Sequence, residues 1–386
     1  MAFIILALIL LLLLPDLYIW LSFVRGSNLP LLLTVAYWLP TLLALGILGL
    51  AATGNYTEWL FKLFFGLLLC IALPKLLFTL VSLLGRATEL LVPGAYTAGN
   101  LIGLVMALTA SAACCYGFAS GWKKLNVQSL TVQSDKLPAA FDGYRILHFS
   151  DLHLGTYGQD TRFVQTVVDR IQALNPHLIV FTGDLVNSTA EELYPHEAVL
   201  SQLHAPDGVF SVLGNHDYCL YRRYDTPDGA ARNLDTLKHH QQAMGWQLLL
   251  NEHRLIRRGT SVIALVGVEN DSKPPFPSRG DLTKAMQGLP AETFKVLLTH
   301  DPSHWRREVL AIPGAPDLTL SGHTHAMQLQ WGNHSPAALA YREWGGLYRE
   351  QEASLYVSTG VGGSVPFRLG AWPQLTLITL KRGNTP

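Results

Sequence analysis

Ser321-Gly322-His323-Thr324-His325 follows the short run Asp317-Leu318-Thr319-Leu320 and contains two histidines separated by one residue. This stretch ends an ordered series of short polar motifs: Asp151-x-His153, Gly183-Asp184, Gly214-Asn215-His216-Asp217, His300 and His323-x-His325. Imidazole suits Zn, Fe and Mn, carboxylate and amide oxygens suit Mn and Fe, and no motif offers a thiolate. We therefore interpret the series as the ligand set of a two-metal centre.

Each motif directly follows a short run that is typical of a buried strand. The five runs are 145–150, 178–182, 209–213, 295–299 and 317–321. In layered α/β folds, ligand sites lie beyond the carboxyl ends of the strands, where the loops converge. We therefore expect all of these donors to lie together at one edge of the sheets.

Two ions about 4 Å apart can share a bridging carboxylate and a bridging hydroxide, and can clamp the oxygens of an in-line displacement. The donor set therefore predicts hydrolysis of a phosphoester or pyrophosphate by a metal-bridging hydroxide, with two divalent ions from among Mn, Fe and Zn. The enzyme class we expect is a metal-dependent phosphoric ester hydrolase, either a phosphodiesterase or a phosphatase.

Residues 143–382 resemble the calcineurin-like metallophosphoesterase superfamily, whose pattern is D-x-H, G-D, G-N-H, H and G-H-x-H. The resemblance implies that one ion is bound by Asp151, His153 and His325, and the other by Asn215, His300 and His323, with Asp184 bridging. It also implies that His216 is the catalytic histidine. The implied fold is an α/β, four-layer sandwich of two mixed β-sheets flanked by helices.

The finer resemblance is to the membrane-anchored bacterial branch of this superfamily, through Phe149-Ser150-Asp151-Leu152-His153 and Tyr356-Val357-Ser358-Thr359-Gly360. Two positions depart from that branch. Ala326 stands where many members have glycine, and Asn187 stands where an acidic residue often occurs. Neither change removes a predicted metal ligand, but both alter the predicted pocket.

His216 and Asp217 are the predicted catalytic residues outside the ligand set. We expect His216 to protonate the leaving alkoxide. Asp217 either orients the imidazole of His216 as a hydrogen-bond acceptor or caps the following turn. Among the other histidines, alternation turns His148 to the opposite face of its strand from Asp151, and the Asp301-Pro302 step separates His304 from His300.

The first 122 residues contain only Arg25, Lys62, Lys75, Arg86, Asp16, Glu58 and Glu89 as charged residues, of 28 basic and 28 acidic residues in the chain. Four apolar runs in this part are long enough to span a membrane: 2–24, 29–52, 59–84 and 99–122. Pro15 and Asp16 interrupt the first run. We expect Asp16, Lys62 and Lys75 to lie separately, near helix ends or snorkelling.

With four spans, the amino terminus, the loop at 55–58 and the hydrolase share one side of the membrane. Lys62, Lys123 and Lys124 lie on that side, against Arg25 and Arg86 on the other. This bias favours a cytoplasmic catalytic domain on an integral protein of a bacterial inner membrane. The neutral overall charge predicts no nucleic-acid partner.

We predict a transmembrane region at 1–122, a connector with a first strand at 123–142, and the metallophosphoesterase domain at 143–386. The connector alternates apolar and polar residues over 127–133, which is typical of a strand. Within the domain, 161–174 and 191–203 are predicted helices.

Two loops that mix cations with aromatics, 218–234 and 331–352, are the predicted substrate loops; the second contains Tyr341, Arg342 and Trp344. Membrane anchoring favours a lipid-linked phosphoester, and a soluble nucleotide fits the same chemistry. A further alternative is a membrane sensor or scaffold whose metal domain binds a phosphorylated ligand without turnover.

Overall fold

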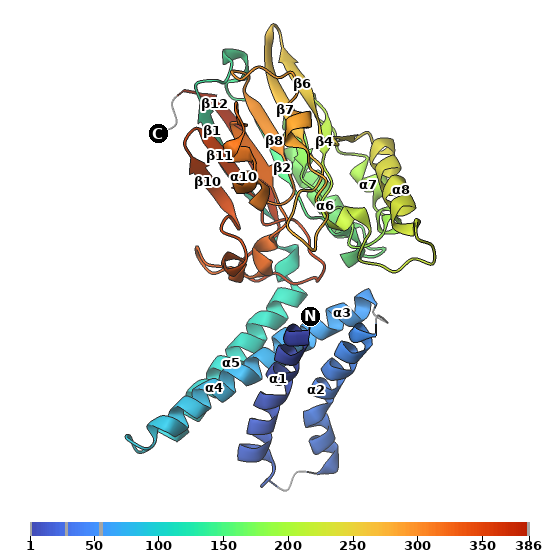
Figure 1. Cartoon of the computed structure of the whole chain (residues 1–386). Helices are drawn as coiled ribbons and strands as arrows, with labels where there is room; N and C mark the ends of the chain where they lie inside the picture. Colours follow the sequence, from blue (N-terminus) through green and yellow to red (C-terminus); the bar gives the residue numbers. More distant parts are fainter. Residues whose placement is uncertain (1, 28–29, 54–56, 384–386) are drawn as a thin grey trace. The chain divides into compact units, whose positions relative to one another are not determined.

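The computed structural model describes residues 2–27, 30–53 and 57–383, which divide between two compact units, Met1–Ser120 and Gly121–Pro386 (Figure 1). Each unit has its own hydrophobic core. The predicted start of the second apolar run, Leu29, lies outside the described residues.

The first unit consists of apolar helices: α1 (Ala2–Ile19), α2 (Leu31–Ala52), α3 (Glu58–Leu67), α4 (Leu73–Thr88) and α5 (Ala95–Ala119). A π-helical turn, Leu68–Ala72, joins α3 and α4 into one apolar segment. Among the described residues, four segments are long and apolar enough to cross a membrane: Ile5–Val24, Leu31–Ala52, Glu58–Thr88 and Ala95–Lys123. The prediction of four apolar helices is confirmed, and the third and fourth extend beyond the predicted runs.

Pro15, which interrupts the first apolar run in the sequence, lies inside α1 and does not end the helix. Beyond α1 the chain continues through a π-helical turn, Trp20–Val24. Apolar membrane helices tolerate proline because neighbouring helices and local helical adjustments satisfy the freed backbone groups. The helix is therefore uninterrupted at Pro15.

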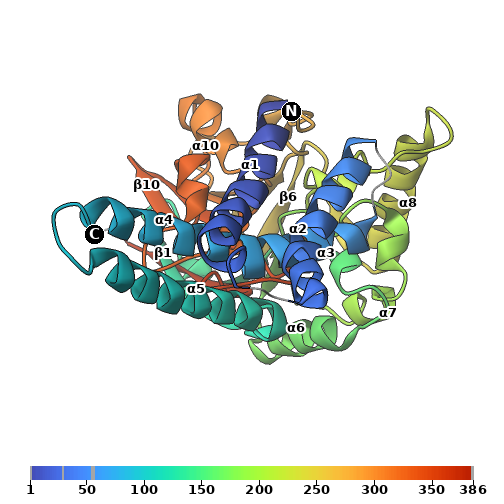
Figure 2. The ribbon, with the colours of Figure 1, turned by 90° about the horizontal axis from the view of Figure 1, so that it is seen from below.

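Helices α4 and α5 pack closely along their length (Figure 2). A Cβ atom added to Gly85 would lie 3.0 Å from the Cα of Gly99, and one added to Gly99 would lie 2.9 Å from the Cα of Gly85. Glycine at both positions lets the two backbones approach, which is how small residues favour helix association in membranes.

Asp16 and Lys75 form an ion pair inside the first unit, with Lys75 Nζ 2.6 Å from Asp16 Oδ1. Asp16 is completely buried, and the hydroxyl of Thr41 donates to its other carboxylate oxygen. The expectation that these charges lie separately near helix ends is therefore wrong for Asp16 and Lys75. Burial in an apolar bundle makes an unpaired charge costly, so the two groups neutralise each other.

The second unit contains two mixed six-stranded sheets. The first has the order β1 (Asn126–Ser134), β12 (Gln374–Arg382), β2 (Arg145–Phe149), β3 (Leu178–Phe181), β4 (Val209–Ser211), β5 (Gln247–Leu248). The second has the order β10 (Gly346–Glu350), β11 (Ala353–Val357), β9 (Leu318–Ser321), β8 (Lys295–Leu298), β7 (Ser261–Gly267), β6 (Glu252–Arg258). Strands β2, β3, β4 and β5 are parallel to one another, as are β7, β8, β9 and β11.

The strands predicted before the motifs are confirmed as β2, β3, β4, β8 and β9, and the predicted connector strand is β1. Alternation along β2 sends Ile146 into a core between the two sheets, which also contains Val296 of β8. Leu147 instead joins an outer core with Val164 of helix α6 (Arg162–Ala173). Each sheet is therefore buried on both faces, as expected for sheets flanked by helices.

Helices α6, α7 (Glu197–Leu200) and α8 (Gly229–Ala243) contribute to the outer side of the first sheet, and α9 (Leu282–Ala285) and α10 (Ser303–Arg307) to that of the second. The predicted four-layer sandwich is confirmed. The predicted helix at 191–203 is wrong as a continuous element, because it divides into a 3₁₀ turn, Ala190–Leu193, and α7. Pro195 accounts for the break, since it has no backbone N–H to continue the helical hydrogen bonds.

Candidate metal centre

The predicted ligands gather where strands of both sheets end. Asp151 follows β2, Asp184 follows β3, Asn215 follows β4, His300 follows β8 and His323 follows β9. In each sheet these strands are parallel, so their carboxyl ends meet at one edge. The topology therefore brings together residues more than 170 positions apart, such as Asp151 and His323, whose N–H lies 3.1 Å from Asp151 Oδ1.

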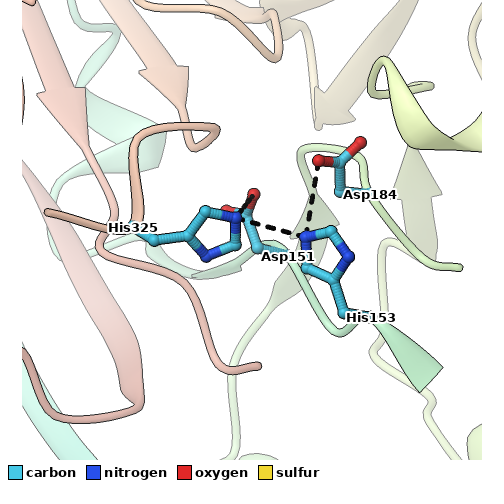
Figure 3. Close-up of side chains that lie close together, drawn as sticks. All are labelled: Asp151, His153, Asp184 and His325. Carbon is cyan, nitrogen blue, oxygen red and sulfur yellow. Dashed lines mark hydrogen bonds and ion pairs between the residues drawn. The ribbon is translucent and has the colours of Figure 1, made fainter. Parts of the chain in front are cut away.

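One group of donors consists of Asp151, His153, Asp184 and His325 (Figure 3). The Nε2 atoms of His153 and His325 are 3.2 Å apart. His153 Nε2 lies 3.5 Å from Asp184 Oδ2, and His325 Nε2 lies 3.4 Å from Asp151 Oδ1. Four side chains from three loops, those after β2, β3 and β9, thus turn their donor atoms toward a common point.

Asp184 also belongs to a second group, with His300 and His323. His300 Nε2 lies 3.1 Å from Asp184 Oδ2, and His300 Nδ1 lies 2.7 Å from the carbonyl of Thr182. A ring nitrogen that donates to a backbone carbonyl leaves the other nitrogen free to bind a metal. Asp184 is therefore placed between two sets of imidazoles.

Asn215 is buried beside these groups, and its backbone neighbour His216 donates its N–H to Asp184 Oδ1 at 2.9 Å. The amide nitrogen of Asn215 donates to Tyr221 Oη at 2.8 Å. Among the described residues, Asn215 Oδ1 has no hydrogen-bond partner. A buried amide oxygen without a partner is costly, unless a ligand satisfies it.

Five of the predicted ligands have a left-handed backbone, which non-glycine residues rarely adopt. The φ angles are 56° for Asp151, 50° for His153, 61° for Asp184, 74° for His323 and 50° for His325. Such conformations cost about 1–3 kcal/mol each and persist where the surrounding structure imposes them. The loops therefore hold these side chains inward at the expense of backbone strain.

Burial and mutual charge set the protonation of the centre. Burial raises the pKa of Asp151 to about 7 and lowers that of His153 to about 3. Burial acts to raise the pKa of Asp184 too, but the charges of His300 and His216 hold it well below its usual range. Negative charge is thus concentrated on the carboxylate that both groups share, and His153 is neutral, the form that binds metals.

His216 lies at the edge of the first group, with its ring 4.8 Å from that of His153 and 4.4 Å from that of Tyr221. His216 Nδ1 lies 2.6 Å from the carbonyl oxygen of Asn187. With Nδ1 donating to that carbonyl, Nε2 is the nitrogen left for exchange of a proton. The His216 ring is therefore held in a fixed orientation beside the first group of donors.

Asp217 does not orient His216, and that expectation is wrong for this structure. Its carboxylate accepts the backbone N–H groups of Asp184 at 2.9 Å, Leu185 at 2.8 Å and Gly214 at 2.8 Å. The loops after β3 and β4 lie side by side, and their donors converge on this buried carboxylate. Asp217 is thus a positioning residue that ties the Asp184 loop to the Asn215 loop.

Three contributing residues were not predicted in these roles: Asn187, Tyr221 and Tyr341. Asn187 Oδ1 lies 3.0 Å from His153 Nδ1, and Tyr341 Oη lies 2.7 Å from His323 Nε2. Asn187 had a signal in the sequence, because it departs from the acidic residue of the family pattern. The tyrosines belong to the predicted substrate loops, where nothing in the sequence distinguishes them from other aromatics.

The two histidines considered outside the ligand set lie away from both groups. His148 is buried in β2 with Nε2 2.8 Å from Thr182 Oγ1. His304 lies 2.9 Å from Glu308 and 3.1 Å from Thr299 Oγ1, and with Asp271 and Glu308 it forms a separate cluster. Arg307 pairs with Asp271 there, so that cluster carries its own cation.

The donors fit divalent metal ions. Within each group, one atom from every side chain lies within 4.8 Å of the others, and the set is nitrogen and oxygen without sulfur. Two buried carboxylates, Asp151 and Asp184, lie among these imidazoles, and within the described part of the chain Asn215 Oδ1 lacks a partner. Clustered Asp and His side chains at the strand ends of a two-sheet sandwich define a metallophosphoesterase fold.

Comparison with known proteins agrees with this class. Residues 144–327 match the family described as Calcineurin-like phosphoesterase, and residues 1–122 match Probable Calcineurin-like phosphoesterase, transmembrane domain. The chain is 30% identical to the "Transmembrane protein with metallophosphoesterase domain" of Danio rerio, over 94% of this chain and 79% of the relative.

Two bacterial proteins are also similar to this chain. The "Uncharacterized metallophosphoesterase YkuE" of Bacillus subtilis is 30% identical, over 74% of this chain and 96% of the relative. The "UDP-2,3-diacylglucosamine pyrophosphatase LpxG" of Chlamydia muridarum is 25% identical, over 66% of this chain and 89% of the relative. The chain belongs to the calcineurin-like metallophosphoesterases. Its four apolar helices and its transmembrane relative support an integral membrane protein.

Proposed function

We propose that this protein is a membrane-anchored two-metal phosphoester hydrolase. Asp151, His153 and His325 would hold one ion, and Asn215, His300 and His323 would hold the other, with Asp184 available to both. The observation that carries this proposal is the position of Asp184, whose carboxylate belongs to both groups of donors.

When bound, divalent ions of the Mn, Fe or Zn type supply an activated water and neutralise charge on the phosphoryl oxygens. The chain's own residues orient the reaction. His216 Nδ1 donates to the carbonyl of Asn187, and Nε2 carries the proton that the leaving oxygen receives. Asp217 holds the loops of Asp184 and Gly214 together, so its role is positioning rather than proton transfer.

The proposed substrate is a lipid-linked phosphoester or pyrophosphate. Two features support it: the four apolar helices place the chain in a membrane, and the name of the Chlamydia relative states a pyrophosphatase that acts on a diacylated nucleotide sugar. A soluble nucleotide is the competing substrate. It has the same phosphate chemistry but requires no membrane anchor.

The proposed location is a bacterial inner membrane with the hydrolase on the cytoplasmic side, supported by Lys62, Lys123 and Lys124 against Arg25 and Arg86. For function, the chain divides into a membrane region at 1–122, a connector at 123–142 and the hydrolase at 143–386. No nucleic-acid partner is proposed, because the net charge is zero.

Hydrolysis of bis-p-nitrophenyl phosphate and p-nitrophenyl phosphate by the detergent-purified chain with added Mn²⁺ tests this function. Metal-dependent turnover that His216→Ala and Asp184→Asn both abolish is the expected result. The two probes also distinguish a phosphodiesterase from a phosphatase. Bound metal without turnover of either probe or of a lipid pyrophosphate would instead favour the sensor or scaffold.

A further inference from the structure

An open cavity of about 460 Å³ lies beside the second group of donors. Three segments form its walls: the loop after β7, the region of α10, and residues 340–343. Its volume is that of a pocket for a small molecule or a lipid headgroup. None of the proposed metal ligands lines the cavity.

The cavity adjoins the metal centre through His323. Three of its lining residues contact that imidazole: Tyr341 Oη lies 2.7 Å from Nε2, the Phe276 ring lies 5.2 Å from the His323 ring, and Asp301 Oδ2 lies 3.8 Å from Nε2. A substrate whose phosphorus is at the metal centre therefore has its next groups within reach of the cavity.

Most charged groups on the cavity wall are already paired. Arg306 lies 2.8 Å from Glu343 and 2.6 Å from Glu350, and Arg307 lies 2.9 Å from Asp271. Because Arg306, Arg307 and Glu343 are paired, these two cations and this carboxylate are not available to bind a charged ligand. The other lining carboxylate, Asp301, accepts the backbone N–H of Ser303 at 2.8 Å and faces His323.

Two cations on the wall remain available. The side chain of Arg342 is 72% exposed, and its only ion contact in the described part of the chain is 3.6 Å from Glu343, which already binds Arg306. Lys273 is exposed and has no ion pair with any residue that the structure describes. Phe276 and Tyr341 add aromatic surface to the same wall. The groups of the cavity wall that are available to a ligand are thus two cations and two aromatic rings.

We propose that this cavity binds a second phosphate group of the substrate, next to the phosphate that is cleaved, with Arg342 and Lys273 as its cations. This inference rests on the proposed function and narrows its substrate class to compounds with two linked phosphates. Arginine recognises phosphate with two parallel hydrogen bonds, and lysine adds a point charge. The part of the substrate beyond the second phosphate packs against Phe276 and Tyr341.

The test compares substrates with one and two phosphates in the full-length chain, purified in detergent with Mn²⁺. The soluble pair is bis-p-nitrophenyl phosphate and UDP-N-acetylglucosamine. The lipid pair, in mixed micelles, is phosphatidic acid and diacylglycerol pyrophosphate. The variants are Arg342→Ala and Lys273→Ala, singly and together. The matched controls are Arg349→Ala and Lys284→Ala, which are exposed cations outside the cavity.

The expected result is that, in one pair at least, the diphosphate has the higher kcat/KM. In that pair the double variant loses at least about tenfold more kcat/KM on the diphosphate than on its one-phosphate partner, mainly through KM. Whether the soluble or the lipid pair responds identifies the source of the second phosphate. The control variants are expected to leave the ratio within about twofold of the wild-type ratio.

Failure of this inference and failure of the proposed function give different results. If bis-p-nitrophenyl phosphate is hydrolysed in a metal-dependent way but the preference for diphosphates is absent, or is the same in the double variant, the cavity does not bind a second phosphate. If all four substrates remain intact while metal is bound, the proposed hydrolase is wrong and this inference fails with it.

Discussion

Both units bury charged side chains, but the groups that compensate these charges differ between the two units. In the membrane unit, Asp16 pairs with Lys75 at 2.6 Å and accepts the hydroxyl of Thr41, so the chain itself neutralises the charge. In the hydrolase unit, Asp184 is surrounded by imidazoles whose second nitrogens are turned to other acceptors, as for His153 and His300.

This difference separates a structural ion pair from a binding site. A pair that is neutral and buried needs no ligand, and its role is to link α1 with α4. A cluster that concentrates carboxylates and imidazoles on a strained backbone, with an Asn215 Oδ1 that has no partner among the described residues, fits bound cations. A buried charge by itself therefore does not indicate function. Buried charged and polar groups that lack partners within the protein do indicate a binding site.

The largest expected effect is the loss of turnover in Asp184→Asn. The substitution keeps the size of the side chain but removes the charge shared by both donor groups. We expect kcat/KM for bis-p-nitrophenyl phosphate to fall about 1000-fold or more, since metal-ion stabilisation contributes several kcal/mol. Asp235→Asn is the control, because that side chain is 76% exposed and lies outside the site. Activity within tenfold of wild type would remove Asp184 from the proposed bridge.

Removal of one partner of the membrane ion pair is expected to affect stability rather than chemistry. Lys75→Ala leaves Asp16 buried without its cation and is expected to lower the free energy of unfolding by about 3–5 kcal/mol. Thermal unfolding of the detergent-solubilised chain measures this change. Lys62→Ala, which breaks the more exposed Glu58 pair, is expected to cost about 0.5 kcal/mol or less.

The double variant Asp16→Asn/Lys75→Met separates the lost pairing from other effects of the substitution. It removes both charges together, so most of the stability lost in Lys75→Ala is expected to return. A double variant as unstable as Lys75→Ala would show that the ion pair is not what joins the helices.

Metal binding is expected to stabilise one unit and not the other. At a free Mn²⁺ concentration about 100-fold above its dissociation constant, linkage predicts a gain of about 2.7 kcal/mol for the unit that binds it. Hydrogen exchange resolved by segment is the measurement, with chelator-treated protein as the reference. The loops after β2, β3, β8 and β9 are expected to gain protection, while α1 and α2 do not. Equal gains in both units would contradict a metal site confined to the hydrolase.

The smallest expected effect concerns Asn187, which orients His153 through its side-chain oxygen. Loss of such a partner typically weakens metal affinity about 10- to 100-fold. We expect Asn187→Ala to weaken Mn²⁺ binding by that factor, as measured by calorimetry. Asn187→Asp keeps an acceptor at the same position, so its Mn²⁺ affinity is expected to be close to that of the wild type. If both variants bind Mn²⁺ equally, the contact with His153 does not tune the metal.

Several features were predictable because they depend on local sequence. The strands β2, β3, β4, β8 and β9 follow from short apolar runs, and four membrane-length helices follow from the length of the apolar segments. The gathering of Asp151 with Asp184 in one sheet, and of His300 with His323 in the other, follows from a general property of parallel strands, whose carboxyl ends share an edge. The break at Pro195 was missed, although its cause is local, because proline has no backbone N–H to continue a helix.

Other features depend on contacts between distant segments. The pairing of Asp16 with Lys75 requires α1 to pack against α4, and the acceptor role of Asp217 requires the loops after β3 and β4 to lie side by side. The same holds for Tyr341 on His323, which comes from a loop without regular spacing. Periodicity and composition carry no information about such contacts.

The sequence by itself determined the residue types of the centre, their order, the strands that carry them and the number of apolar helices, because periodicity, length and donor chemistry are properties of the chain. Only the tertiary structure decided which nitrogens of His153 and His300 turn to other acceptors, which backbone conformations are left-handed, and which cations on the cavity wall stay exposed. The physical reason is that hydrogen bonds and ion pairs between segments select among side-chain arrangements that the local sequence leaves equally open.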